Sequence, residues 1–255
     1  MYNYNERQLA IRGEILDKLF GRNSVLEALK SGTRTINKIL ISKTAHGRSI
    51  SEIIRLAKNK GIVINSVPPE KLDKFENENT QGVVAEVSAT DYVELEDLID
   101  IAKNKENGLL LLLDGIEDPH NLGAIIRNAV CFGVDGIIIP KWRSATVNET
   151  VERTSAGAVE HIKIARVTNS SQAILKLKEE GFWILGAENG NRKINETKVP
   201  FPAVLVMGSE GFGIHQKIKE KCDFIITIPQ KNTISSLNVS CASAVILYSI
   251  QLFNR

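Results

Sequence analysis

The sequence predicts an α/β protein of two units, the second built on a doubly wound parallel sheet. Short apolar segments typical of strands alternate with segments of helical periodicity along most of the chain. The run of five leucines and an aspartate at residues 109–114 has the continuous apolar character of a strand buried on both faces. A polar, acidic segment at residues 91–108 separates this run from the elements before it, which indicates a linker.

The composition is that of an ordinary globular protein. The chain has 255 residues, a hydrophobic share of 43% and a formal net charge of +2, so the total charge alone does not indicate a nucleic-acid-binding protein. Between Ile15 and Ile50, however, seven lysines and arginines stand against Asp17 and Glu27, a local balance of +5. Such a patch is suited to phosphate, although a solvated basic face is the plainer interpretation of charge alone.

The cysteines and the apolar segments indicate a cytoplasmic location. Cys131, Cys222 and Cys241 show no CxxC spacing and lie in or beside apolar segments, which predicts reduced, buried thiols and no metal site. The N-terminal residues lack the apolar region of a secretory signal. No apolar run approaches the length of about 20 residues that spans a bilayer. We therefore expect neither a membrane segment nor a metal.

The first unit is expected at residues 17–90, after a polar leader at residues 1–16. Apolar spacing predicts helices at 21–32 and 49–61, with Gly32 and Gly61 as stops, and a short helix after Pro68 and Pro69. Ser49 and Glu52 have the spacing of a capping box. Strands are expected at 36–42, 62–67 and 82–89.

The second unit is expected at residues 109–255. The predicted strands lie at 109–114, 136–140, 162–166, 182–188, 203–208 and 224–229. The predicted helices lie at 121–133, 148–157, 170–181 and 215–222, with a last helix beginning near Leu237. Ligands of such sheets bind beyond the carboxyl ends of the strands. That rule points to the loops after Asp114, Gly208 and Pro229.

The first of these loops reads DGIEDPHNLGAIIRNA, and the second reads MGSEGFGI. Asn121 and Arg127 in the first loop are a possible ligand-binding pair, and the alternative is a helix cap followed by a surface arginine. The second loop has glycines in a G-x-x-G-x-G pattern, which differs from both the Rossmann and the Walker patterns. Glycines there permit close backbone approach to a ligand, whereas Glu210 disfavours a phosphate.

The third loop lies within KNTISSLNVSCASAVILY, residues 231–248, where a polar segment precedes an apolar helix. Ser235, Ser236 and Asn238 can each cap that helix, and Asn232 suits a turn. Because one cap is sufficient, the surplus of polar side chains suggests that some of them bind a ligand.

The three loops, in this order, resemble the three motifs of the SpoU (TrmH-like) branch of the SPOUT RNA 2′-O-methyltransferases. DPHNLGAIIRNA, VLVMGSEGFGI and IPQKNTISSLNVSCASAVILY carry the resemblance over roughly residues 109–253. GRNSVLEAL and QGVVAEV in residues 19–89 resemble the small ribosomal-protein-like substrate-binding domain of the same family. The chain is most similar to the 23S ribosomal RNA guanosine 2′-O-methyltransferases. It departs from the family pattern at Thr80, where histidine is frequent, and at Asn232, where glycine is frequent.

The resemblance implies a trefoil-knotted α/β domain that binds S-adenosylmethionine, works as a homodimer through its C-terminal domain and needs no metal. It assigns cofactor contacts to five residues of the second and third motifs: Gly208, Gly211, Ile228, Pro229 and Leu237. It makes Arg127 the central catalytic residue, with Asn121 orienting it or the RNA. It also gives Glu210 a role in shaping the site, and Ser236 and Asn238 a role in holding the ribose or Arg127. His120 is implied as a loop or RNA contact.

The expected function is methyl transfer to a ribose 2′-hydroxyl of ribosomal RNA, at a guanosine of 23S RNA. Two alternatives are a transfer RNA 2′-O-methyltransferase and a non-catalytic RNA-binding assembly factor of the same fold. The presence of Arg127, Glu210 and Asn238 disfavours the assembly factor. A nucleotide-dependent oxidoreductase is disfavoured because no G-x-G-x-x-G follows the strand at 109–114.

Overall fold

The computed structural model describes residues 16–75, 79–231 and 236–253. Within them the chain forms two compact units. The first unit comprises the described residues up to Asp91 together with Val147–His161, and the second comprises Tyr92–Thr146 and the described residues from Ile162 onward. The leader at residues 1–15 lies outside the described residues, as do Asn232 and Ser235.

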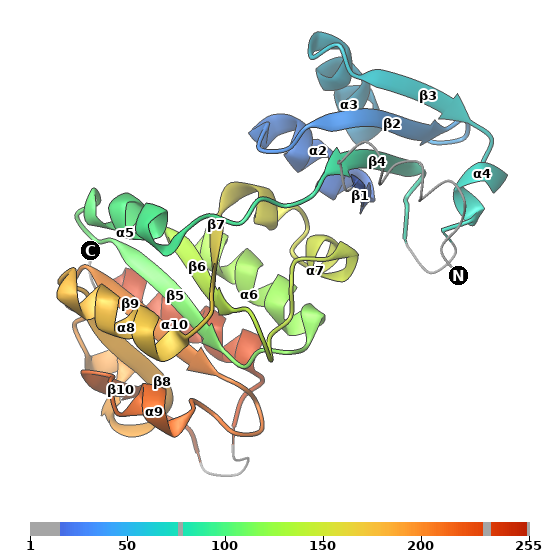
Figure 1. Ribbon diagram of the computed structural model, residues 1–255. Helices are drawn as coiled ribbons and strands as arrows, with labels where there is room; N and C mark the ends of the chain where they lie inside the picture. Colours follow the sequence, from blue (N-terminus) through green and yellow to red (C-terminus); the bar gives the residue numbers. More distant parts are fainter. Residues whose placement is uncertain (1–15, 76–78, 232–235, 254–255) are drawn as a thin grey trace. The chain divides into compact units, whose positions relative to one another are not determined.

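The first unit is a four-stranded mixed sheet in the order β1-β4-β2-β3, with β2 and β3 parallel and the other pairs antiparallel (Figure 1). Helices α2 and α3 share an apolar core with β1, β2 and β4, which includes Leu29, Ile39 and Ile53. The elements of this unit are β1 (Leu16–Phe20), α2 (Arg22–Ser31), β2 (Ile36–Ser42), α3 (Arg48–Asn59), β3 (Val63–Val67), α4 (Glu70–Asp73), β4 (Val83–Ser88), α7 (Glu149–Thr154) and η1 (Ala158–His161).

One strand of this unit was not predicted, and one expectation for the unit is wrong. Strand β1 begins at the end of the expected leader and pairs antiparallel with β4, because the alternation in Leu-Asp-Lys-Leu-Phe suits a half-buried strand. The predicted capping box at Ser49 is absent: Gly47 is the N-cap of α3, without a side-chain hydrogen bond, so Ser49 lies inside the helix. The helix at residues 148–157 is present as the shorter α7, and it packs in this unit instead of the second.

The basic patch of the first unit is partly neutralised. Arg34 is buried, and its guanidinium forms ion pairs with Glu152 at 2.6 Å and Glu160 at 3.0 Å. Lys38 pairs with Glu86 at 3.0 Å, and Lys30 pairs with Glu27 at 3.2 Å. The buried cluster of Arg34, Glu152 and Glu160 fixes α7 and η1 within this unit. Burial raises the pKa of Glu152 to about 7, although the attraction of the Arg34 guanidinium opposes the shift.

The second unit is a six-stranded parallel sheet in the order β10-β8-β9-β5-β6-β7 (Figure 1). The leucine run forms β5 at a central position, and its six residues are all buried. The elements of this unit are α5 (Leu95–Lys103), β5 (Leu109–Asp114), α6 (Pro119–Cys131), β6 (Gly136–Pro140), β7 (Lys163–Val167), α8 (Ser170–Glu179), β8 (Trp183–Lys193), η2 (Ile194–Glu196), β9 (Ala203–Gly208), α9 (Gln216–Lys219), β10 (Phe224–Thr227) and α10 (Val239–Phe253).

Helices cover both faces of this sheet. One face packs against α5, α8 and α9, through a core that includes Leu98, Ile174 and Ile218. Helices α6 and α10 pack against one another, and Asn128 joins them by donating to the Ser240 carbonyl at 2.8 Å and the Ser243 hydroxyl at 2.9 Å. This packing holds the first turns of α10 against the second half of α6.

The segment expected as a linker at residues 91–108 contains a core helix of the second unit. Helix α5 has a capping box formed by Glu94 and Asp97, and its Leu98 and Ala102 are fully buried. The expected burial of the cysteines is also partly wrong. All three are free thiols, but Cys131 and Cys241 are exposed, and only Cys222 is largely covered. Burial raises the pKa of the Cys222 thiol to about 11.

Candidate active site

The first and second motif loops meet at the carboxyl edge of the sheet. Strands β5 and β9 are parallel neighbours, and Asp114 at the end of β5 pairs with Gly208 at the end of β9. The loops that follow them therefore leave the sheet side by side. The third motif loop joins them because α10 packs against α6.

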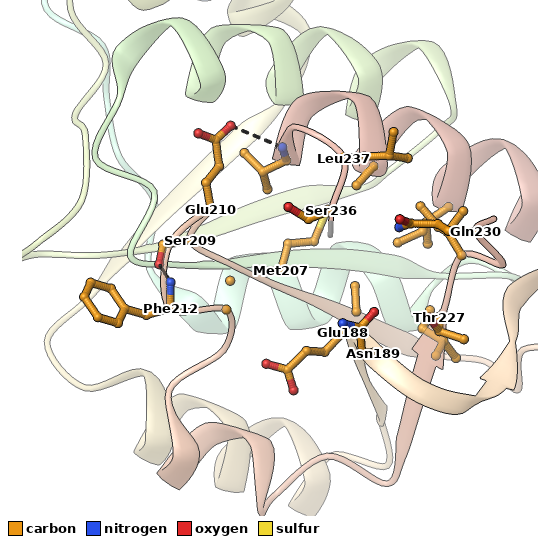
Figure 2. Close-up of a pocket in the computed structure, with 18 residues that line it drawn as sticks. Glu188, Asn189, Met207, Ser209, Glu210, Phe212, Thr227, Gln230, Ser236 and Leu237 are labelled. Carbon is orange, nitrogen blue, oxygen red and sulfur yellow. Dashed lines mark hydrogen bonds between the residues drawn. The ribbon is translucent and has the colours of Figure 1, made fainter. Parts of the chain in front are cut away.

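A polar cluster connects the three loops. The Asn121 amide donates to Glu210 Oε1 at 3.2 Å, and the Asn238 amide donates to Asn121 Oδ1 at 3.0 Å and to the Glu210 carboxylate. The backbone N–H of Val239 also donates to Glu210 Oε1, at 3.4 Å (Figure 2). The structure thus brings together Asn121, Glu210 and Asn238, three residues that the sequence predicts for one site.

Asn238 caps the last helix while it belongs to this cluster. Its side-chain oxygen accepts from the backbone N–H groups of Ser240 at 2.9 Å and Cys241 at 3.4 Å, and from the Ser240 hydroxyl at 2.6 Å. Helix α10 begins at Val239, two residues later than the sequence predicts. Ser236, another expected cap, lines a cavity instead.

This first cavity has a volume of about 300 Å³ and lies between the second and third motif loops (Figure 2). Apolar side chains, including Met207, Ile226 and Ile246, form part of its wall. Leu237 also lines it and is 43% exposed, so a large apolar side chain is left without cover. The polar lining residues are Glu188, Asn189, Ser209, Glu210, Thr227, Gln230 and Ser236.

Gly208 and Gly213 are required by the backbone conformation of the second loop. A Cβ added at Gly208 would lie 2.0 Å from the carbonyl carbon of Gly213, and Gly213 has a left-handed φ of 65°. Ser209 and Gly213 exchange backbone hydrogen bonds of 3.1 and 2.9 Å, which closes the loop. Nothing lies within 4 Å of a Cβ added at Gly211, so that position has open space.

The cofactor contacts predicted from the sequence divide into three groups. Gly208, Ile228 and Leu237 line the first cavity. Gly211 lines a second, neighbouring cavity, and Pro229 lines neither of the two. The sequence reasoning did not identify Glu188 and Asn189, although they continue β8 past its last pairing with β9 at the same edge of the sheet.

Arg127 lies apart from the polar cluster. It is exposed and lines neither cavity. Helix α6 runs on to Cys131, so six residues place Arg127 about 9 Å along the axis from Asn121 and about 120° around it.

The last helix presents apolar side chains to the surface. Val245, Tyr248, Leu252 and Phe253 are 40–53% exposed, whereas Ile246 is buried in the core. The Tyr248 ring contacts Phe132 at the end of α6 at a centroid distance of 6.1 Å.

The described residues offer neither a membrane span nor a metal site. None of their helices is long and apolar enough to cross a membrane. They contain no group of three or more histidine, cysteine, aspartate or glutamate side chains arranged to hold a metal ion.

The chain is similar to known proteins along most of its length. Residues 108–248 match the model of the SpoU rRNA Methylase family, and residues 18–93 match the model described as RNA 2′-O ribose methyltransferase substrate binding. YacO of Bacillus subtilis, assigned to the TrmH family of tRNA/rRNA methyltransferases, is 42% identical over 236 residues, which is 92% of this chain and 94% of YacO. A Staphylococcus haemolyticus protein with the same assignment is 41% identical over 91% of this chain and 94% of its own length.

Solved structures confirm the predicted fold class. The SpoU methyltransferase AviRb of Streptomyces viridochromogenes, solved in complex with AdoMet, superposes with a TM-score of 0.78 at 23% identity, over 100% of this chain and 96% of AviRb. The family was predicted from the three motif loops, and the match of the family model over residues 108–248 confirms it. The chain therefore belongs to the SpoU family of RNA methyltransferases.

Proposed function

We propose that the protein transfers a methyl group from S-adenosylmethionine to a ribose 2′-hydroxyl of ribosomal RNA, at a guanosine of 23S RNA. The polar cluster of Asn121, Glu210 and Asn238 beside the first cavity is the observation that carries this proposal. It joins a binding cavity to a set of fixed hydrogen-bonding groups at the edge of a parallel sheet, where ligands of such sheets bind.

The first cavity fits the methyl donor. Its volume of about 300 Å³ lies at the lower end of the range of roughly 300–1,000 Å³ that small-molecule sites occupy. Leu237, Met207 and Ile226 offer apolar surface to a purine, and Asn189 and Gln230 offer hydrogen bonds to a ribose and an amino-acid group. When bound, S-adenosylmethionine supplies an already activated methyl group.

The residues of the chain must then position the ribose hydroxyl, promote loss of its proton and exclude water. Glu210 holds the amides of Asn121 and Asn238 in place. Both N–H groups of the Asn238 amide are used within the cluster, whereas the second N–H of the Asn121 amide is left for the RNA. Ser236 is placed to hold the ribose. Arg127 acts by stabilising the developing alkoxide, because a guanidinium stays protonated and is a poor general base.

Arg127 reaches the site of a second copy of the chain in this proposal. It is exposed on α6, away from the cluster of its own chain, and the exposed stripe of α10 lies on the helix packed against α6. A homodimer formed through these two helices covers Val245, Tyr248 and Leu252. Each active site then combines the cofactor cavity of one chain with Arg127 of its partner.

Ribosomal RNA is favoured over transfer RNA by the first unit. QGVVAEV in this unit resembles the substrate-binding domain of the ribosomal enzymes, whereas the substrate-binding model that matches residues 18–93 names no RNA class. The relatives at 41–42% identity are named for both RNA classes, so they do not discriminate between them. A transfer RNA acceptor is therefore the second candidate.

Methyl transfer to separated RNA pools tests the proposal. The purified protein is incubated with labelled S-adenosylmethionine and either 23S, 16S or transfer RNA, and the digested nucleosides are analysed by mass spectrometry. The expected product is 2′-O-methylguanosine in 23S RNA alone. Arg127→Ala is expected to lower the rate by on the order of 10²–10³-fold, because it removes charge stabilisation of the transition state.

A matched variant is Lys198→Ala, which removes an exposed cation from the segment between η2 and β9 that lines neither cavity. It is expected to retain the wild-type rate. Methylated transfer RNA would contradict the ribosomal assignment, and label in a base instead of the ribose would contradict the proposed chemistry.

A further inference from the structure

A second cavity, of about 490 Å³, lies on the other side of the loop that carries Glu210. It shares Ser209, Glu210, Phe212 and Val239 with the first cavity. Its remaining walls come from the loop after β5, from Arg143 after β6 and from His215 before α9. The two cavities are therefore neighbours with a common wall, and the polar cluster belongs to that wall.

The proposed reaction requires such a pair of spaces. An attacking oxygen must come within about 3–3.5 Å of the methyl group that it receives. With the donor in the first cavity, the acceptor must enter through a space that reaches the wall around Glu210 and Asn121. The second cavity meets this condition, since both residues line it.

His215 is held rigidly at this cavity. Asp114, which is 4% exposed, accepts from the His215 backbone N–H at 2.8 Å and is 2.9 Å from its Nδ1. Because Nδ1 faces the carboxylate, Nε2 is the ring nitrogen left for a ligand. The side chain is 54% exposed, so a ligand in the cavity has access to it. A buried carboxylate thus orients a polar anchor that the polar cluster does not use.

The rim of the same cavity combines a cation with exposed aromatic rings. Arg143 lines the cavity and has a left-handed φ of 55° in the loop after β6. Its neighbour Trp142 is 64% exposed, and Phe212 is 92% exposed. They are the two most exposed large apolar side chains in the described part of the chain. Aromatic faces stack on unpaired bases, and a guanidinium binds phosphate through charge-assisted hydrogen bonds.

We infer that the second cavity binds the acceptor nucleotide in an unstacked conformation, with Arg143 on its phosphate, His215 on its base or sugar, and Phe212 against its base. This inference rests on the proposed function, because it places the acceptor relative to the methyl donor. It also defines the substrate class. A base stacked within a duplex does not enter such a cavity, so the target nucleotide lies in a loop, a bulge or another single-stranded segment.

Nucleotide binding tests the cavity without methyl transfer. The chain has two tryptophans, so Trp183→Phe leaves Trp142 as the single fluorescent reporter beside Arg143. Guanosine 5′-monophosphate is expected to change the Trp142 emission saturably and to bind more tightly than guanosine. Arg143→Ala is expected to weaken monophosphate binding roughly tenfold and to leave guanosine binding unchanged, because it removes a charge-assisted hydrogen bond. Arg143→Lys should restore part of the difference, and Lys198→Ala should have no effect.

Equal affinities for the two ligands, an Arg143→Ala variant that binds like the wild type, or the absence of a saturable change would each overturn the inference. The kinetics of methyl transfer to the RNA substrate give a second readout. Arg143→Ala and His215→Ala should raise the KM for RNA and leave the KM for S-adenosylmethionine unchanged. The two proposals fail differently: a wild-type protein that methylates no RNA refutes the function, whereas an active protein with unchanged KM values in both variants refutes the acceptor cavity.

Discussion

At the scale of single residues, Asn238 has two separable tasks. Its side-chain oxygen caps α10, and its amide nitrogen donates to Asn121 and Glu210. Asn238→Asp keeps the cap, because aspartate caps helices as well as asparagine does. It also replaces the donor with a second carboxylate facing Glu210, and like charges at this distance repel. Because the cap is kept, we expect repulsion from Glu210 and the lost amide hydrogen bonds to be the only causes of a lower thermal unfolding midpoint. We expect the methyl-transfer rate to fall by roughly 10- to 100-fold, since charge-assisted hydrogen bonds are lost.

Asn238→Ala is the comparison for that variant. It removes both tasks and should lower the stability by about 1 kcal/mol in addition to the rate. Calorimetry and initial rates on the same preparations separate the two effects. An Asn238→Asp protein with the wild-type rate would show that the amide donor is not needed.

The motif strings were sufficient to predict that Asn121, Glu210 and Asn238 belong to one site. They did not reveal which residue of the third loop is the cap, because Ser236 and Asn238 offer equivalent oxygens. The pairing of Asp114 with His215 was also missed, since the two residues are 101 positions apart and neither lies within the motif strings.

At the scale of elements, the attachment of α7 and η1 to the first unit depends on the ionisation of the Glu152 carboxyl group. Burial raises the pKa of Glu152 from 4.5 to about 7, against the opposing effect of Arg34. A raised folded-state pKa contributes stability that is fully present below about pH 4.5 and is lost as the pH rises through about 7. We expect this contribution to be on the order of 3 kcal/mol. Hydrogen exchange of α2 and β2 amides, corrected for intrinsic rates, should show protection falling from pH 5 to pH 8.

Glu152→Gln should abolish that change, because its amide does not ionise. Glu70→Gln, at an exposed glutamate of the same unit, should retain it. Equal pH dependence in the wild type and Glu152→Gln would refute the assignment. The sequence did not predict this cluster, because Arg34 and Glu152 each read as ordinary surface charges on a helix or in a basic patch, and only the tertiary structure buries them together.

At the scale of the whole molecule, most strands and helices followed from periodicity, since the apolar runs are long and the glycines mark several helix ends. Periodicity did not predict that Val147–His161 joins the first unit or that α5 belongs to the second. Both assignments depend on contacts between distant segments. The same limit applies to the dimer: apolar spacing in α10 is compatible with core or interface, and it is the exposure of Tyr248 and Leu252 that favours an interface.

If the active site is shared between two chains, two different inactivating variants should restore activity when they are mixed. A site formed within one chain should not show this recovery. If Arg127 serves the partner's cofactor cavity, a chain with Arg127→Ala retains an intact cavity, and a chain with Asn238→Asp retains an intact arginine. Each homodimer has two impaired sites, but a mixed dimer contains one complete site. Random exchange of equal amounts makes half of the dimers mixed, so activity should recover to roughly a quarter of the wild-type value, as expected for a symmetric two-fold interface.

Subunit exchange is achieved by mixing tagged and untagged chains under mild urea, followed by dilution, and mixed dimers are counted by affinity capture. Tyr248→Asp combined with Leu252→Asp provides the control. It places charges on the exposed stripe of α10, and it should yield monomers that bind S-adenosylmethionine but neither methylate RNA nor complement another variant. If mixed dimers form and stay inactive, Arg127 acts within its own chain, and α6 must then change its arrangement when RNA binds.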